Sequence, residues 1–159
     1  MNLTFDPYAF VFSIVLHYFI VPWLLNHQLK PRPDLPPAIK AAANLLLATG
    51  GIFMVVGVAC GVLFADLSRL WRFVWIAIAS IGGALWIWNA FRLRDGSRSA
   101  RWASIPFLVA MLPCLPVLGW ITAPITAYCL FLDRRAKRFF REQASSAAHP
   151  ASTLSTTSL

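Results

Sequence analysis

His17 is the strongest candidate in this sequence for a residue with a chemical role. Apart from tyrosine and cysteine, it is the only ionisable residue deep within an apolar run of this chain. Ionisable residues inside a membrane are functional candidates by default, because placing them there is costly. An imidazole at this depth could carry a proton, ligate a haem or bind a metal. The simpler interpretation, which we favour, is a neutral imidazole hydrogen-bonded to a neighbouring helix.

A cofactor or metal site would need more ligands than the sequence offers. The other two histidines are His27, about 15 Å further along the same helix, and His149, in a polar C-terminal tail. The three cysteines all lie inside apolar runs and form no CxxC pair, which argues against zinc or a disulfide framework. The sequence therefore predicts no cofactor and no metal.

Catalytic motifs are also missing from the sequence. The chain has no GxSxG, no HExxH and no glycine-rich phosphate loop, and every Asp and Glu lies outside the apolar runs. Ser13 precedes His17 by one helical turn, but we interpret that pair as packing. The sequence leaves enzymatic activity open and favours none.

The elements around these residues follow from composition. The 159-residue chain is 58% hydrophobic and 13% charged, against about 45–50% and about 25% in soluble domains. Uncharged apolar runs of 18 or more residues predict membrane helices. We therefore predict an all-α, polytopic helical membrane protein with one domain, residues 1–142, and a disordered tail, residues 143–159. Its predicted parts are transmembrane helices 7–25, 41–65 and 73–91, a segment 102–132, and a basic juxtamembrane segment 133–142.

Segment 102–132 decides the topology. It has 31 residues, no charge and four prolines. A straight helix of that length would measure about 46 Å, whereas the hydrocarbon core is about 30 Å thick. Helix breakers gather near its middle, and we take Pro113, Pro116 and Gly119 as the turn of a re-entrant or short two-span hairpin. The alternative is a single crossing, which would give four transmembrane helices.

The positive charges distinguish these two topologies. Lys and Arg number zero before the first helix, three, two and four in the successive loops, and five after residue 132. A single crossing would divide them seven to seven, and a hairpin would divide them twelve to two. Positive residues stay cytoplasmic, so the hairpin predicts an outside N-terminus and a cytoplasmic C-terminus. The preference for Arg over Lys suggests a bacterial inner membrane.

Two further patterns predict helix pairing. Asn44 and Asn89 would lie at similar depth near the cytoplasmic ends of their helices, where they could form an interhelical hydrogen bond. A line of small residues marks one face of the second helix: Ala43, Gly50, Gly57 and Gly61. Such a face lets another backbone approach closely. Its partner would be the third helix or, alternatively, a second copy of the chain.

The strongest candidate for interaction is a basic cluster after the last apolar run. It consists of Arg134, Arg135, Lys137, Arg138 and Arg141, which could hold anionic lipid headgroups or a protein partner. The alternative is an ordinary cytoplasmic anchor. The net charge of +8 would suggest nucleic acid in a soluble protein, but these charges flank apolar runs and we predict no nucleic-acid binding.

Together these observations predict a non-catalytic membrane protein that acts through helix and surface contacts. Accessory subunits, assembly factors and exclusion or immunity proteins are of this kind. Its expected partners are the lipid bilayer, anionic headgroups, and either a membrane protein or further copies of itself. The alternative is a small channel, carrier or small-molecule binding protein that uses His17 and the proline hairpin.

Overall fold

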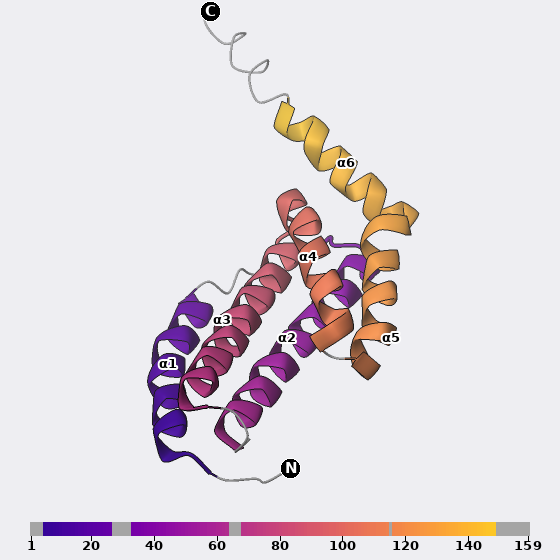
Figure 1. Cartoon of the computed structure of the whole chain (residues 1–159). Helices are drawn as coiled ribbons and strands as arrows, with labels where there is room; N and C mark the ends of the chain where they lie inside the picture. The colour runs from indigo at the N-terminus through magenta and orange to yellow at the C-terminus, as the bar shows by residue number, and fades with distance from the viewer. Residues whose placement is uncertain (1–4, 27–32, 64–67, 115, 149–159) are drawn as a thin grey trace, which may run out of the picture.

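The chain folds into a helical bundle (Figure 1). The computed structural model describes residues 5–26, 33–63, 68–114 and 116–148. Within those ranges it contains helices and no strands, which confirms the all-α prediction. The elements are α1 (Pro7–Asn26), α2 (Pro37–Leu63), α3 (Arg69–Arg94), α4 (Arg98–Cys114), α5 (Pro116–Ala127), the π-helical segment η1 (Tyr128–Leu132) and α6 (Arg134–Ala148).

Three of these helices, α1, α2 and α3, are long and apolar enough to cross a membrane. α2 and α3 extend furthest beyond the predicted spans. α2 begins four residues early at Pro37, since proline is favoured in the first turn, where no helical donor is lost. α3 continues through arginines at both ends. A charged residue ends an apolar run but not a helix, because a long side chain can extend its charge toward water.

The central contact joins α2 and α3 through small residues. A Cβ atom at Gly57 would overlap Ala79, and one at Gly61 would overlap Ile76. A Cβ at Gly83 would lie 2.9 Å from the Met54 Cβ, too close for a real contact. Glycine therefore permits a backbone approach that a larger residue would block.

Segment 102–132 lies within two helices of a hairpin rather than one straight helix. α4 ends at Cys114 and α5 begins at Pro116. Gly119 packs directly on the Met111 carbonyl oxygen, and the rings of Trp102 and Phe131 lie 5.7 Å apart. The start of α4 therefore lies beside the end of the α5–η1 leg. That this hairpin enters the membrane stays a prediction.

The main hydrophobic core lies between the α2–α3 pair and the hairpin. Trp86 of α3 is buried there, with its ring 5.5 Å from Phe107 of α4 and 5.9 Å from Phe53 of α2. Leu35, which precedes α2 in a proline-rich segment, is also buried in this core. The core thus fixes the hairpin to the two central helices.

α1 lies on the other side of the central pair (Figure 1). Its buried Ala9 belongs to a separate small cluster with Val62 of α2 and Ile76 of α3. Most of its large apolar side chains, such as Tyr18 and Phe19, are exposed. α1 and the hairpin therefore cover different faces of the α2–α3 pair.

α6 leaves the bundle at the end where η1 finishes (Figure 1). Asp133 caps it, since its Oδ1 accepts a hydrogen bond from the Ala136 amide at 2.8 Å. The helix continues to Ala148, into the segment predicted to be disordered, because alanine-rich sequence favours helix. The remainder of that tail, residues 149–159, lies outside the described residues.

Candidate functional site

His17 faces the junction of α1 and α2. Its Nδ1 lies 2.8 Å from the Ser13 carbonyl oxygen, one turn back on the same helix. A carbonyl only accepts, so Nδ1 donates this bond. The expected bond to a neighbouring helix is thus replaced by one within α1. The half-buried imidazole borders a groove of about 490 Å³ along α1 and α2, whose wall is otherwise almost entirely apolar.

The structure does not bring His17 and the hairpin together. α1 packs on α2 and α3, and the hairpin packs on the opposite face of that pair. A single cavity containing both is therefore not formed by the described residues. Among those residues, no three His, Cys, Asp or Glu side chains gather as a possible metal site.

The predicted Asn44–Asn89 hydrogen bond is wrong. Asn89 is buried and donates through Nδ2 to the Ser104 Oγ of α4 at 2.9 Å. Asn44 lies at the surface, where its Oδ1 accepts a 2.6 Å bond from Nη2 of Arg94. The two asparagines point in different directions, so each bonds to a different element.

The predicted small-residue face of α2 lies largely against α3. Gly50, Gly57 and Gly61 all face it closely enough that a Cβ would crowd or overlap an α3 side chain. Ala43 is buried in the main core. The partner of this face in the structure is the same chain.

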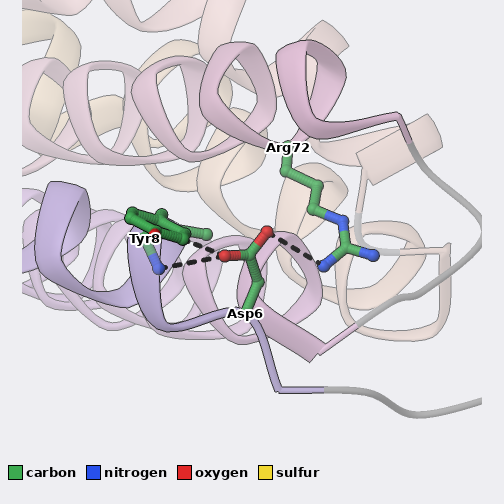
Figure 2. Close-up of polar contacts among 4 residues, drawn as sticks. Asp6, Tyr8 and Arg72 are labelled. Atoms are coloured by element: carbon green, nitrogen blue, oxygen red, sulfur yellow. Dashed lines mark hydrogen bonds and ion pairs between the residues drawn. The ribbon is translucent and has the colours of Figure 1, made fainter.

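At the end of the bundle where α1 begins, Asp6 joins three helices. Its Oδ1 accepts hydrogen bonds from the amides of Tyr8 and Ala9, at 2.9 and 3.3 Å, which caps α1. Its Oδ2 lies 3.4 Å from Nη1 of Arg72 on α3 (Figure 2). Its amide donates to the Val62 carbonyl of α2 at 3.2 Å.

The two arginines of the predicted second loop lie in the first turn of α3, and both are engaged at this end. Arg72 pairs with Asp6, and the Arg69 guanidinium lies 5.1 Å from the centre of the Tyr8 ring. These contacts give α1 a fixed attachment despite its small buried area. They also partner the two positive charges that the predicted topology leaves on the outer side.

The other end of the bundle gathers the remaining basic segments. Arg94 bonds to Asn44 near the start of α2. The Arg101 guanidinium at the start of α4 lies 5.2 Å from the centre of the Phe140 ring of α6. The start of α2, the α3–α4 loop and the start of α6 therefore meet at one end.

α6 is attached there by its apolar face. Ala136 and Phe140 are buried in the main core, four residues apart on one side of the helix. The five predicted docking residues all remain exposed: Arg134, Arg135, Lys137, Arg138 and Arg141. The buried face holds the helix, so its basic face is presented in a fixed orientation.

A recess of about 250 Å³ lies between α4 and α6. Two cations of α4, Arg98 and Arg101, and two of α6, Lys137 and Arg141, line it. Phe140 and Ala144 complete the lining. No carboxylate contributes, and the one ion pair among the described residues is Asp6–Arg72 at the opposite end.

Arg101 is held in this recess by aromatic rings. Its guanidinium lies 5.0 Å from the Phe131 ring centre, 5.2 Å from that of Phe140 and 5.8 Å from that of Trp102. Its Nε is buried and has no hydrogen-bond partner among the described residues. Burial, followed by the nearby charge of Arg98, lowers the pKa of Arg101.

This recess is not predicted by the sequence. In the sequence, Arg98 and Arg101 are only charges that indicate topology, and Lys137 and Arg141 are only part of a linear cluster. The i, i+3 and i, i+4 spacings do predict one shared face on each helix, but not that the two faces meet. At the opposite end of the bundle, the sequence does indicate the Asp6 cap, because Asp6 directly precedes a proline at the first helical position.

Comparisons of the chain with family models, with curated proteins and with solved structures found no match. What the protein does must therefore be inferred from its own geometry.

Proposed function

We propose that the chain is a non-catalytic bacterial inner-membrane protein that works through contacts made by its helices and by α6. Accessory, assembly, and exclusion or immunity roles are all of this type. The observation that carries the proposal is the attachment of α6. Ala136 and Phe140 are buried in the main core while five cations remain exposed on the same helix. A rigidly held basic helix next to membrane spans suits anionic headgroups or an acidic partner surface.

The proposed orientation has the N-terminus outside and α6 in the cytoplasm. Support comes from the meeting of Arg94, Arg101 and α6 at one end of the bundle. Positive residues near helix ends stay on the cytoplasmic side. The α4–α5 hairpin then enters and leaves the membrane at that side, shielded by the central helices as its interrupted backbone requires.

The polar groups inside the helices support contact rather than chemistry. Asn89 bonds to Ser104, Thr49 donates to the Leu45 carbonyl oxygen, and His17 bonds within its own helix. Each of these bonds satisfies a polar group in an apolar surrounding. We expect such bonds to stabilise the fold rather than to act on a substrate.

Purification in gentle detergent after crosslinking tests this proposal. We expect a stoichiometric membrane-protein partner or a defined homo-oligomer, whose yield falls in the Arg134→Gln/Arg138→Gln variant. A monomer with no crosslinked partner, unaffected by that variant, would contradict the contact function.

One observation favours a second candidate, the binding of a small apolar molecule. The groove beside His17 is about 490 Å³ in volume and lies between α1 and α2. A pocket of this size and apolar lining is typical of small-molecule sites. Replacing Val58 with Phe should then abolish binding while His17→Ala weakens it, and no change in either variant would eliminate this candidate.

A further inference from the structure

The recess between α4 and α6 differs from an ordinary cluster of surface charges. Its four cations come from two helices and face one small volume: Arg98, Arg101, Lys137 and Arg141. Like charges brought together without a carboxylate repel one another, and a bound anion removes that repulsion. An anion bound in the recess would therefore be attracted by four positive charges at once.

Two of the four cations in the α3–α4 loop region are excluded from this role by their own contacts. Arg92 donates to the hydroxyls of Ser97 and Ser99, at 3.4 and 2.5 Å. Arg94 donates to Asn44. Arg98 and Arg101 form no hydrogen bond or ion pair with another described residue, and they line the recess. Of the four arginines on either side of the α3–α4 loop, Arg92 and Arg94 thus serve the structure. Arg98 and Arg101 are left for a ligand.

The residues that line the recess indicate what kind of anion it takes. Phe140 is almost fully buried in the wall, and the Arg101 guanidinium lies over the rings of Phe131 and Phe140. A planar guanidinium donates two parallel hydrogen bonds to a phosphate. A monoester offers three terminal oxygens and needs only one exit for its substituent, whereas a diester offers two and needs two exits.

We propose that this recess binds the phosphate of a monoester, with Arg101 as the bidentate donor and Arg98, Lys137 and Arg141 as surrounding charges. The proposal rests on the function proposed above for α6. It names the ligand chemistry that Lys137 and Arg141 of that helix recognise. The phosphate can belong to a lipid such as phosphatidic acid at the membrane surface, or to a free phosphate in the cytoplasm.

The lowered pKa of Arg101 supports this assignment. Burial and the neighbouring Arg98 both disfavour the charged form. A dianion in the recess stabilises that charged form in return, so binding and charge reinforce each other.

Native mass spectrometry of the full-length protein tests the proposal. The protein is titrated with phosphatidic acid, with phosphatidylglycerol of the same acyl chains, and with inorganic phosphate. We expect phosphatidic acid to bind about tenfold more tightly than the diester lipid. Lys137→Gln/Arg141→Gln should abolish that preference, and Arg98→Gln should reduce it.

The matched control is Arg134→Gln/Arg138→Gln. It removes the same charge from exposed positions of the same helix that do not line the recess, so it should keep the preference. Both double variants retain Phe140, and circular dichroism with size-exclusion chromatography verifies that both fold.

The outcomes separate the two sources of phosphate. A preference for phosphatidic acid that inorganic phosphate does not compete away assigns the site to a lipid headgroup. Binding of inorganic phosphate that is lost only in Lys137→Gln/Arg141→Gln assigns it to a free phosphate, and supports the same chemistry.

The outcomes also separate this proposal from the function on which it rests. If both double variants weaken the binding of every anionic lipid to the same extent, the recess is not a site and α6 acts by general charge. If neither double variant weakens the binding of any anionic lipid, both the proposed phosphate site and the proposed headgroup contact of α6 are overturned.

Discussion

Gly57 of α2 lies against Ala79 of α3 so closely that a Cβ atom at position 57 would overlap the Ala79 methyl group. This contact lies in the central pair around which the other helices pack. Because Ala79 has no flexible side chain, the overlap can be relieved only by separating the two backbones.

Gly57→Ala should therefore destabilise the protein by about 1–3 kcal/mol, the usual cost of overpacking. The unfolding midpoint in detergent measures it. Gly51→Ala is the matched control, since a Cβ there meets nothing within 4 Å. Adding Ala79→Gly to Gly57→Ala should restore part of the stability. An equal loss from Gly51→Ala, or no rescue, would refute the close contact.

The Asn89–Ser104 bond fixes the hairpin to α3. Double-mutant cycles measure its coupling, which we expect to be about 0.6 kcal/mol, the average for interhelical hydrogen bonds in membranes. Asn89→Leu with Ser104→Ala should be non-additive. Asn44→Leu with Asn89→Leu should be additive, because Asn44 bonds to Arg94 instead. The reverse pattern would place the asparagines against each other.

Asp6 acts both as a helix cap and as the partner of Arg72. Asn is also a good cap, so Asp6→Asn removes only the charge and should cost about 1–3 kcal/mol. Asp6→Ala removes the cap as well, which should add about 1 kcal/mol. Thermal unfolding of both variants verifies this order. Equal losses would mean that the Asp6 cap contributes nothing to α1.

Binding of phosphatidic acid should strengthen as the pH rises from 5 to 8. The second proton of a phosphate monoester leaves near pH 6, so the ligand gains charge, while Arg and Lys stay protonated over the same range. Phosphatidylglycerol has no such second proton and provides the control. A pH-independent affinity for phosphatidic acid would show that the dianion is not the bound form.

The three long helices could be predicted because a charge-free run longer than the membrane is thick admits few other structures. The hydrogen-bond partners of the polar side chains could not be predicted in this way. Each residue turns a helix by about 100°, so the sequence positions of Asn44 and Asn89 do not show in which direction their side chains point. Direction follows from packing, here from the small residues that set the α2–α3 contact.

The recess was unpredictable for a related reason. Arg98 and Arg101 lie at the start of α4, the first leg of the hairpin, and Lys137 and Arg141 lie after its second leg. They meet only because the α5–η1 leg returns to the end of the bundle where α4 begins. The helix breakers in 102–132 indicated a hairpin, but not the rotation of α6 that turns Lys137 and Arg141 toward α4.

We propose that the α3–α4 loop and α6 lie on one cytoplasmic surface. Single cysteines at Ser68, Ser97 and Ser145, in a background without native cysteines, test it with a membrane-impermeant thiol reagent on intact cells. We predict labelling of position 68 only, with positions 97 and 145 labelled after the cells are opened. Labelling of 145 but not 97 in intact cells would place the two segments on opposite sides and contradict the account.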